Sequence, residues 1–590
     1  MCELHDALKA GAFTGHELER LLVRILFCMF AEDTGIFPPD AFTQFIRTHT
    51  REDGSDLGQH LNHLFEVLDT APGQHQPGLD EDLAAFPYVN GLLFRERLRT
   101  AVFNRAMRES LLCCCDFSWA RISPAVFGSL FQGVIEDRVR RQQGAHYTSE
   151  RDIMKVVRSL FLDELRAEFE QLKRDRSTRR RANLETFQQK LRALRFLDPA
   201  CGCGNFLVLT YRELRLLEIE VLREIYGLEQ RELNVRDLCE VDVDQFYGIE
   251  ISEWPVRIAE VALWLMDHQM NAQAAEAFGQ SFDRLPLRSS PHIVQANALR
   301  IDWNDVLPRE KCSYVLGNPP FVGKHLMTKE QRQDMDVVWG ETHGVGVLDY
   351  VTAWYRRAAE YIQGPGMVVG FVSTNSITQG EQVGVLWSEL FQRYHVKIHF
   401  AHRTFPWESE ARGASHVHVV IIGFGALDTA GKRIFDYEDD RVTVAQARNI
   451  SPYLVEGPDV VVTSRRRPIC DVPACQYGSK PADGGHLIIE EVDRRRFLEE
   501  NPIARRYLRP LLCAEEYLYS IPRWCLWLVD ASPADIRSIP GIRQRVQAVR
   551  SFREASIKAP TREKAALPAL FAEIRQPATR YIVIPRHTSE

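Results

Sequence analysis

The sequence contains no long hydrophobic run. No stretch of its 590 residues approaches the roughly 18 consecutive apolar residues of a membrane-spanning helix. The most apolar early run, residues 21–30, contains Arg24 and is followed by Glu32 and Asp33. The first residues also lack the basic and then apolar pattern of a secretory signal peptide. The sequence therefore predicts a cytoplasmic protein that does not enter a membrane.

Cysteine pairs at zinc-binding spacing are also missing. The 13 cysteines are an odd number; Cys201 and Cys203 are separated by a single residue, and Cys113–Cys115 follow one another directly. Structural zinc sites need two well-spaced pairs of ligands, and a long chain without a secretion signal favours free thiols over disulfides. We therefore predict no metal site, and we expect these thiols to lie buried in a hydrophobic core.

An excess of positive charge, the usual sign of a nucleic-acid-binding protein, is absent as well. The net charge is −7 and the isoelectric point is about 6.3. A nucleic-acid surface needs only local positive potential, however. Basic clusters lie at Arg138–Arg141, Lys173–Arg181, Arg465–Arg467, Arg494–Arg496 and Arg505–Arg506. Composition therefore leaves nucleic-acid binding open.

Hydrophobic periodicity divides the chain into three parts. Residues 1–140 carry apolar stripes at helix spacing, clearest at Leu21–Phe30, and predict a helical connector or spacer domain. In residues 141–430 short apolar runs alternate with helical stretches, which predicts an α/β domain with a parallel sheet and helices on both faces. Residues 163–192 are a charged helical insertion before its first strand. Residues 431–590 predict an irregular α+β domain.

Short apolar runs that end in turn residues mark the expected strands. In the α/β part these are Leu194–Leu197, Phe246–Ile249, His292–Gln295, Tyr314–Leu316, Met367–Val372, Lys397–Ala401 and Val417–Phe424. In the last part they are Val460–Thr463, His486–Ile489, Trp524–Val529 and Tyr581–Ile584.

The first motif with chemical content is Asp198–Phe206, which reads DPACGCGNF. An apolar run ends in an acidic residue, and a glycine-rich turn then leads into a helix. Glycine lets the backbone approach a ligand closely, and in α/β sheets such turns lie at the carboxyl edge, where ligands bind. The segment lacks the GxxxxGK[ST] pattern that holds triphosphates, which disfavours a nucleotidase. A GxG pair alone would be an ordinary turn; the full segment is far more specific.

Two further polar residues follow the next expected strands. Glu250 closes the strand at 246–249, where a carboxylate can accept hydrogen bonds from both hydroxyls of a ribose. Asn297 follows the strand at 292–295 and can hydrogen-bond an adenine ring. Either residue alone would most often be a solvated cap. Their order at successive strand ends favours a site for a ribose and an adenine.

The segment Asn318–Phe321, which reads NPPF, is the decisive motif. Two prolines stiffen the loop and remove two backbone donors. The Asn318 amide oxygen and a proline carbonyl can together accept both hydrogens of an exocyclic amine, which leaves the amine lone pair available for attack. Phe321 offers a stacking face for an extruded base. The alternative interpretation is a rigid structural turn.

The order of these motifs resembles the amino-methyltransferases of DNA, whose [DNS]PP[YFW] loop matches Asn318–Phe321. The segment Gly144–Ser149 looks like the one that closes over the methionine part of their cofactor. Its position before Asp198–Phe206 is the gamma-type order of N6-adenine enzymes. Val126–Phe131, Gly144–Ser149 and Gly364–Asn375 look like the MmeI-like (type IIG/IIL restriction–modification) group. The resemblance implies a class I S-adenosylmethionine-dependent methyltransferase sheet, an N-terminal helical domain and a C-terminal α+β target-recognition region.

The resemblance also implies roles for single residues, with S-adenosyl-L-methionine as the cofactor. The catalytic loop would consist of Asn318, Pro319, Pro320 and Phe321. Thr148 would contact the carboxylate end of the cofactor, and its methionine pocket would be shaped by Asp198, Ala200, Gly202 and Gly204. Glu250 would hold the ribose, Ile251 would lie against the adenine ring, and Asn297 would bind the adenine edge, where the family more often has Asp. Phe405 looks like the second aromatic residue that sandwiches the target base, with Trp407 as the alternative.

The function that the resemblance implies is site-specific methylation of adenine N6 in double-stranded DNA, within a restriction–modification or phage-defence system. We expect a monomer, with a separate nuclease or other defence-system subunits as candidate partners. The PD-(D/E)xK pattern of the group's nuclease is not found before residue 140, so the sequence does not predict nuclease activity. We also expect the chain to end inside its target-recognition domain. Two alternatives stay open: a methyltransferase of the same fold acting on RNA or protein, and a DNA-binding remnant without catalysis.

Overall fold

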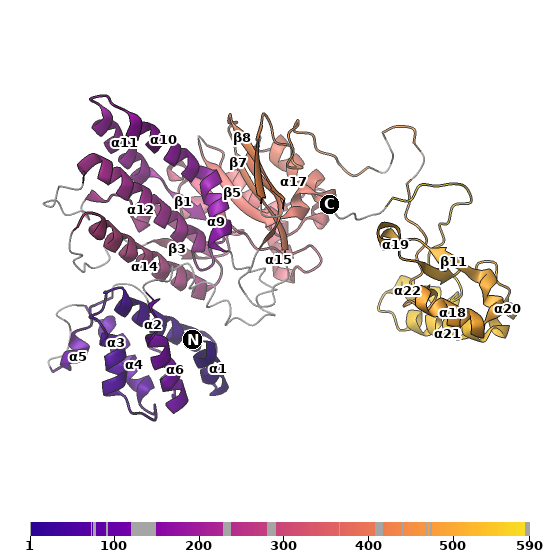
Figure 1. The fold of residues 1–590 in the computed structure, drawn as a ribbon, viewed down its shortest axis with the longest axis horizontal. Coiled ribbons are helices and arrows are strands. Elements are labelled where there is room, and N and C mark those ends of the chain that lie inside the picture. Colours follow the sequence, from indigo (N-terminus) through magenta and orange to yellow (C-terminus); the bar gives the residue numbers. More distant parts are fainter. Residues whose placement is uncertain are drawn as a thin grey trace. The chain divides into compact units, whose positions relative to one another are not determined.

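The computed structural model of the chain divides into two compact units, Met1–Ser464 and Arg465–Glu590, which are described separately (Figure 1). The described residues are 2–71, 74, 78–89, 93–119, 149–227, 238–279, 291–364, 366–407, 417–438, 441–465, 467, 469–472 and 475–584. None of the helices in these ranges is long and apolar enough to cross a membrane.

The first unit begins with a group of helices. They are α1 (Cys2–Ala10), α2 (His16–Asp33), α3 (Ala41–His49), α4 (Leu57–Leu68), α5 (Glu81–Ala84) and α6 (Arg105–Cys115). The apolar stripe at 21–30 lies in α2, as predicted, and α2 is buried on nearly all sides. Arg24 is tolerated there because its guanidinium donates to the carbonyls of Leu93 (2.8 Å) and Glu96 (2.7 Å).

A mixed sheet, nine-stranded among the described residues, forms the centre of the first unit, in the order β3-β2-β1-β4-β5-β7-β6-β8-β9. The strands are β1 (Phe196–Asp198), β2 (Phe246–Glu250), β3 (His292–Gln295), β4 (Tyr314–Gly317), β5 (Val368–Thr374), β6 (Lys397–Trp407), β7 (Val417–Gly425), β8 (Lys432–Glu438) and β9 (Arg441–Ala447). The seven strands expected in this part are all present. The sheet continues to Ala447, beyond the boundary expected at residue 430.

The predicted parallel pairing holds for β3-β2-β1-β4-β5, but the sheet is mixed, because β7 is antiparallel to both of its neighbours, β5 and β6, and β9 is antiparallel to β8. Strand β7 directly follows β6 in the chain, and consecutive strands can pair antiparallel without a crossover helix. It therefore inserts between β5 and β6, which run in the same direction. Strand β6 also extends to Trp407, so Phe405 lies within a strand rather than after one.

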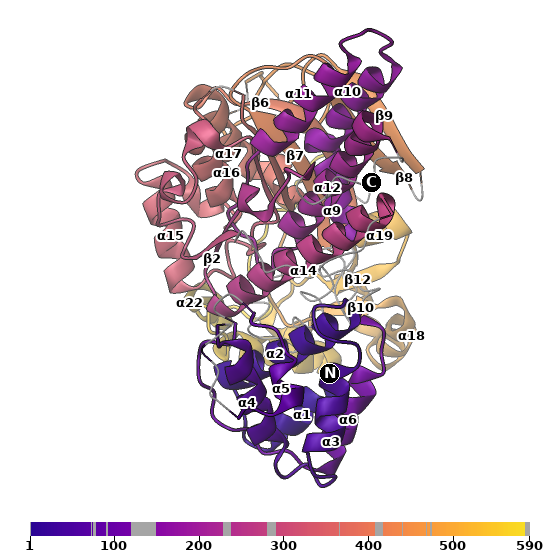
Figure 2. The ribbon, with the colours of Figure 1, turned by 90° about the vertical axis from the view of Figure 1, so that its left-hand side faces the viewer.

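Helices cover both faces of the sheet (Figure 2). One face carries α9 (Glu150–Val157), a π-helical turn (Arg158–Leu162), α10 (Asp163–Arg174), α11 (Arg180–Ala193), α12 (Asn205–Tyr226) and α14 (Glu253–Ala277), and the other carries α15 (Lys329–Trp339), α16 (Thr352–Tyr361) and α17 (Gly380–Gln392). Successive strand residues point to opposite faces: Phe196 packs in the first hydrophobic core and Leu197 in the second. Helices α10 and α11 confirm the predicted charged helical insertion.

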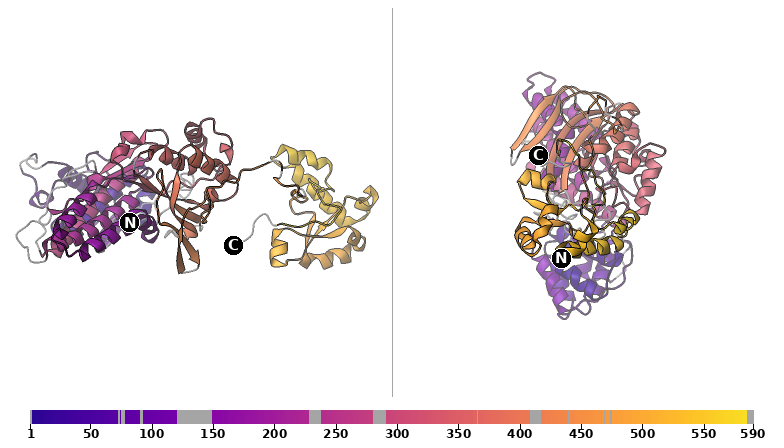
Figure 3. Two further views of the ribbon diagram at one scale, coloured as in Figure 1. Left: turned by 90° about the horizontal axis from the view of Figure 1, so that it is seen from above. Right: turned by 90° about the vertical axis from the view of Figure 1, so that its right-hand side faces the viewer.

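The second unit contains a small antiparallel sheet in the order β10-β12-β11, three-stranded among the described residues (Figure 3). Its elements are β10 (Ile488–Glu490), α18 (Glu491–Glu500), β11 (Leu508–Leu511), α19 (Ala514–Tyr519), β12 (Arg523–Leu526), α20 (Pro533–Ser538), α21 (Pro540–Glu554) and α22 (Ala559–Glu563). The strands predicted near 486 and 524 are present. Those predicted at Val460–Thr463 and Tyr581–Ile584 are wrong: neither segment pairs with a strand of the described chain.

The expected burial of the cysteines holds only in part. Cys201 is buried and Cys203 half-buried, whereas Cys113 is exposed and Cys114 and Cys115 are half-buried. The last three belong to the final turn of the amphipathic helix α6, whose buried residues lie nearer its start. The run of three cysteines at the end of α6 therefore does not lie in the hydrophobic core.

Candidate cofactor and methyl-transfer site

The predicted site residues converge on one edge of the sheet, where the parallel strands β1, β2 and β4 end. In the register, Asp198 lies beside Gly248 of β2, and β4 flanks β1 on its other side. Thr148, together with residues 126–131 and 144–147, lies outside the described part of the chain. Ser149 is described and caps α9, accepting a hydrogen bond from the Asp152 amide (3.2 Å).

Two carboxyl groups lie at this edge, that of the fully buried Asp198 and that of the half-buried Glu250. Asp198 is fully buried, and its Oδ1 accepts a hydrogen bond from the Ala200 amide (3.0 Å). Glu250 accepts from the amides of Gly202 (3.2 Å) and Ser252 (2.9 Å). Burial raises the pKa of Asp198 to about 8, with a smaller contribution from the charge of Glu250. Burial likewise raises the pKa of Glu250.

The turn between β1 and α12 needs both of its glycines. Gly202 has φ 52° and Gly204 has φ 82°, a region that side chains other than glycine rarely adopt. Gly204 also lies against α14, where a Cβ atom would come within 2.8 Å of the Ala259 Cβ. The turn thereby brings the N-terminus of α12, with its free amides, to the edge that carries Asp198.

Ile251 and Asn297 lie beside this turn. The Ala296 amide donates to the carbonyl of Glu250 (2.9 Å), which places Asn297 next to the end of β2. Ile251 is 58% exposed, which is high for an isoleucine inside a domain. Its free face can lie against a flat ring. Asn297 is half-buried, and its amide already contacts Leu299 and Asp334.

The loop Asn318–Phe321 leaves β4 directly beside Asp198. A Cβ atom at Gly317 would lie 2.5 Å from Oδ1 of Asp198, so the two loops are in van der Waals contact. Asn318 and Pro320 are half-buried and Pro319 is buried. Phe321 is half-buried and packs against the cores on both faces of the sheet. The expected methionine pocket and the expected amine-acceptor loop are thus adjacent.

Residues that the sequence analysis missed hold this loop in place. The Asp349 carboxylate accepts from the Lys324 amide (2.9 Å), from the Ser376 hydroxyl (2.7 Å) and from the Gln382 side chain (2.9 Å). Ser376 lies two residues beyond the end of β5. Asp349 therefore ties the segment after Phe321 to the neighbouring strand. No local sequence pattern distinguishes this aspartate from a solvated one.

A second group of missed residues, Tyr350 and Trp354, connects the two loops. The Tyr350 amide donates to the carbonyl of Val322 (3.0 Å), and the Trp354 indole donates to the carbonyl of Pro199 (3.0 Å). The two rings touch edge to face, with centroids 5.2 Å apart. One short segment therefore contacts both the turn after β1 and the end of the loop after β4.

Phe405 lies in an aromatic cluster at the same edge, since β6 runs parallel to β5. It is 3% exposed, and its ring centroid is 4.8 Å from that of Tyr437 and 6.0 Å from that of Trp407. The Lys155 ammonium lies over the Phe405 ring at 3.9 Å and pairs with Asp152 at 2.6 Å. The two candidate aromatic residues, Phe405 and Trp407, are thus neighbours, and both are buried.

A histidine stands behind this aromatic cluster. The His402 ring contacts the Tyr437 hydroxyl at 2.6 Å and the Ser159 hydroxyl at 2.9 Å, and it stacks on Phe435. Burial, together with the positive charges of Lys155 and Arg433, lowers the pKa of His402 to about 3. The His402 ring is therefore neutral at physiological pH, and its hydrogen bond holds the Tyr437 hydroxyl in place.

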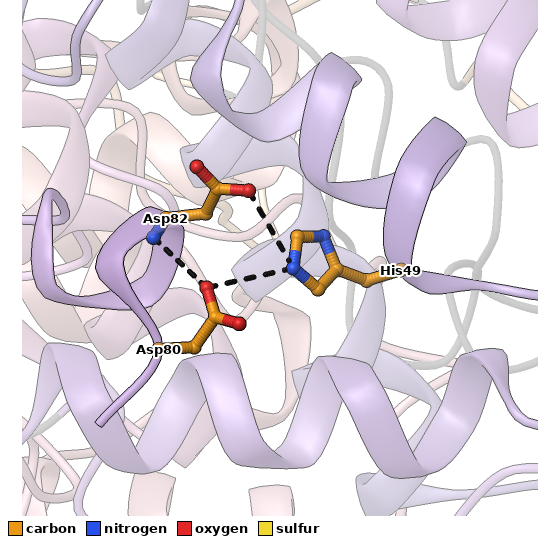
Figure 4. Close-up of side chains that lie close together, drawn as sticks. All are labelled: His49, Asp80 and Asp82. Atoms are coloured by element: carbon orange, nitrogen blue, oxygen red, sulfur yellow. Dashed lines mark hydrogen bonds and ion pairs between the residues drawn. The ribbon is translucent and has the colours of Figure 1, made fainter. Parts of the chain in front are cut away.

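Within the described residues, the potential metal ligands that cluster are His49, Asp80 and Asp82, far from this site in the helical part (Figure 4). The Nε2 atom of His49 lies 3.6 Å from Asp80 Oδ1 and 3.5 Å from Asp82 Oδ2. Asp80 also caps α5 through the Asp82 amide (2.9 Å). Both carboxylates are at least half exposed. These contacts join the end of α3 to the start of α5.

The fold and the site together define a class. The strand order 3-2-1-4-5-7-6 with an antiparallel seventh strand, and an acidic, glycine-rich turn after the first strand, are those of class I S-adenosylmethionine-dependent methyltransferases. The family described as "MmeI, DNA-methyltransferase domain" matches residues 172–436. "MmeI, target recognition domain" matches residues 456–590, and "MmeI, helicase spacer domain" matches residues 16–94.

Whole-chain comparisons agree with these domain matches. The type IIL restriction–modification enzyme MmeI, solved in complex with DNA, is 50% identical with a TM-score of 0.89, over 98% of this chain and 77% of that one. DNA methyltransferase A of Bacillus subtilis is 38% identical over 98% of this chain, which spans 64% of the length of that relative. The chain belongs to the MmeI family. Its fold and its resemblance to this group, both predicted from sequence, are confirmed.

Proposed function

We propose that the chain transfers a methyl group from S-adenosyl-L-methionine to the N6 amine of adenine at specific sites in duplex DNA, within a restriction–modification or phage-defence system. The observation that supports this proposal most directly is the contact at Gly317 between the turn of Asp198 and the loop Asn318–Phe321. It supports a cofactor pocket at Asp198 next to an amine-accepting loop. The membership of the MmeI family, with its methyltransferase and target-recognition domains, supports duplex DNA as the substrate.

The residues present at the edge fit this cofactor. The Oδ2 atom of Asp198 is buried and has no hydrogen-bond partner in the described part of the chain, so a bound donor would satisfy it. The cofactor carries an ammonium and a sulfonium cation, and both are compatible with the carboxyls of Asp198 and Glu250. Glu250 is also suited to a ribose, and the exposed side chain of Ile251 to an adenine face. When bound, the cofactor supplies an electrophilic methyl group.

The chain contributes positioning and electrostatics to the reaction. The Asn318 amide oxygen and the carbonyl of Pro319 or Pro320 accept the two amine hydrogens. Those contacts keep the lone pair of the amine directed away from the loop and toward the Asp198 pocket. Phe321 on one side and Phe405 on the other hold the extruded base. Trp407, whose ring lies 6.0 Å from that of Phe405, is the alternative partner for the base.

The test is a labelling assay with the purified chain, methyl-labelled cofactor and three acceptors: duplex DNA of random sequence, transfer RNA and bacterial protein. We expect label in DNA only, recovered as N6-methyladenine by mass spectrometry, and none with Asn318→Ala. Recovery of N4-methylcytosine alone would overturn the choice of adenine. Label in RNA or protein would favour a methyltransferase of the same fold that acts on those substrates. Binding of DNA without label would favour a DNA-binding remnant without catalysis. Methylation-sensitive long-read sequencing of DNA from expressing cells would then read the target site.

A further inference from the structure

Asp334, on α15, is a buried carboxylate next to the expected cofactor site. It is 3% exposed. Its oxygens accept hydrogen bonds from Arg300 Nε (2.6 Å), from the Tyr350 hydroxyl (2.7 Å) and from Asn297 Nδ2 (3.1 Å). A buried carboxylate held by three donors, two from the turn at residues 297–300 and one from Tyr350, has a fixed position.

The contact with Asp334 fixes the orientation of the Asn297 amide. The Asn297 Oδ1 accepts from the Leu299 amide (2.9 Å), and its Nδ2 donates to Asp334 Oδ2. If the Asn297 amide were flipped, its N–H group would face the N–H of Leu299 and its oxygen would face the Asp334 carboxylate. The nitrogen of Asn297 retains one more hydrogen to donate. In this orientation the side chain offers a donor, whereas an aspartate at the same position could only accept.

Tyr350 extends the connection to the catalytic loop. Its hydroxyl donates to Asp334, and its backbone amide donates to the carbonyl of Val322, next to Phe321. The ring is 5% exposed, and burial together with the bond to Asp334 raises the pKa of its hydroxyl. Asp334 therefore has one contact toward the expected adenine subsite and another toward the methyl-transfer loop.

We propose that Asp334 is a positioning residue that holds Asn297 as a hydrogen-bond donor to the adenine of the cofactor. This rests on the proposed function, in which Asn297 lies at the adenine edge. Adenine offers an acceptor at ring nitrogen N1 and a donor at its amine. An amide nitrogen held by Asp334 pairs with N1, whereas an aspartate would pair with the amine. The Asn297–Asp334 pair thus replaces the aspartate that the family more often has at position 297.

The pair can be tested by exchanging its two members. Asn297→Asp alone would bring two carboxyl groups to about the 3.1 Å that now separates Asn297 Nδ2 from Asp334 Oδ2. We expect it to weaken binding of S-adenosyl-L-homocysteine, measured by calorimetry, at least 10-fold. The exchange variant Asn297→Asp/Asp334→Asn should recover most of the affinity, because an amide again faces a carboxylate. No recovery in the exchange variant would overturn the proposal.

A second measurement uses selectivity, which a purely structural role would not change. The wild-type chain should bind S-adenosyl-L-homocysteine about 5-fold more tightly than its 1-deaza analogue, which lacks the N1 acceptor, a factor typical of one neutral hydrogen bond. Asp334→Leu should remove this preference, because leucine has no oxygen to accept from Asn297 Nδ2, and so should the exchange variant. Arg300→Gln is the matched control: it removes a different donor from Asp334, and the preference should remain. Preserved selectivity in Asp334→Leu contradicts the proposal.

Failure of the proposed function would look different. If Asn297→Ala binds both ligands as the wild type does, Asn297 does not contact the cofactor, and the adenine subsite of the proposed function is wrong. If Asn297→Ala loses the preference while Asp334→Leu keeps it, only the role of Asp334 fails. In the double variant with Asn297→Ala, Asp334→Leu should have no further effect on affinity, because Asp334 acts through Asn297.

Discussion

The Asp198 carboxyl and the backbone of Gly317 are in direct contact, so that a Cβ atom at residue 317 would lie 2.5 Å from Oδ1 and 3.0 Å from Cγ of Asp198. The two residues end neighbouring strands, β1 and β4. Asp198 is fully buried and cannot swing into solvent. Residue 317 must therefore be a glycine, because any larger side chain would displace Asp198 as well as the start of the Asn318–Phe321 loop.

Gly317→Ala should displace Asp198 and lower both cofactor affinity and methyl transfer, the latter at least 10-fold. An added methyl group in so tight a space also costs roughly 1–3 kcal/mol of stability. Calorimetry with the cofactor and denaturant unfolding measure the two effects. Gly323→Ala is the control, because its Cβ would meet Asp349 at an ordinary 3.8 Å. Equal activity of the two variants would show that the contact at Gly317 is unimportant.

Cofactor binding should release a proton near neutral pH. The Asp198 carboxyl has a pKa of about 8 in the folded chain, against a usual 3.8, so it is largely protonated at pH 7. A cationic ligand favours the charged form, and affinity should therefore rise between pH 7 and pH 9. Calorimetry at pH 7 in two buffers of different ionisation enthalpy detects the released proton. Asp198→Asn should abolish the release; identical heats in both buffers for the wild type would contradict the prediction.

The same carboxyl predicts how stability without cofactor depends on pH. Because the pKa of Asp198 is raised in the folded state, the unfolded chain loses this proton first as pH rises from 3.8. The contribution of the group to the free energy of unfolding is therefore fully present below pH 4 and declines until the pH passes about 8. Asp198→Asn should unfold with a weaker decline over this range, as measured by urea titration at several pH values. An identical slope in both proteins would argue against a raised pKa.

The positions of β1 to β7 could be predicted from sequence, because each is an apolar run bounded by turn residues. Strands β8 and β9 were missed, because polar residues interrupt both and β9 is almost wholly exposed. The carboxyl-edge positions of Asp198, Glu250 and Asn318 follow from the strand ends. The insertion of β7 could not be predicted, since it depends on pairing between strands far apart in the chain. Asp349 and Trp354 were missed for the same reason. A polar side chain that binds a distant backbone atom leaves no periodicity in its own segment.

Asn318→Ala should separate chemistry from binding. The variant loses one acceptor for the amine, an interaction made chiefly in the transition state, and keeps the Asp198 pocket and the Phe321 ring. Turnover on duplex DNA should therefore fall by at least 100-fold, while cofactor affinity stays within about 2-fold. Single-turnover kinetics and calorimetry measure the two. Near-normal turnover would mean that the loop is structural.

Phe321→Ala should instead weaken capture of the extruded base. Aromatic stacking contributes roughly 1–3 kcal/mol per base. A 2-aminopurine placed at the target position becomes brighter when it leaves the helix, and it should brighten less with this variant than with the wild type. Asn318→Ala is the comparison, because it retains the stacking ring and should brighten almost normally. Full brightening with Phe321→Ala would exclude the ring from the base pocket.

The ion pair beneath Phe405 gives the last prediction. The Lys155 ammonium contacts Asp152 at 2.6 Å, and their side chains are only 17% and 4% exposed. Lys155→Met removes the charge over the Phe405 ring and leaves the Asp152 carboxylate buried without its cation. Breaking a buried pair from one side typically costs about 3 kcal/mol, whereas neutralising both partners costs much less. Lys155→Met should therefore be less stable to urea than Lys155→Met/Asp152→Asn.

Both variants should also brighten 2-aminopurine less than the wild type, because neither keeps a cation on the Phe405 ring, a contact that contributes roughly 0.5–2 kcal/mol. If the double variant is no more stable than Lys155→Met, the cost of an unpaired Asp152 carboxylate has been misjudged. If it brightens the probe fully, Lys155 does not support Phe405 in holding the base.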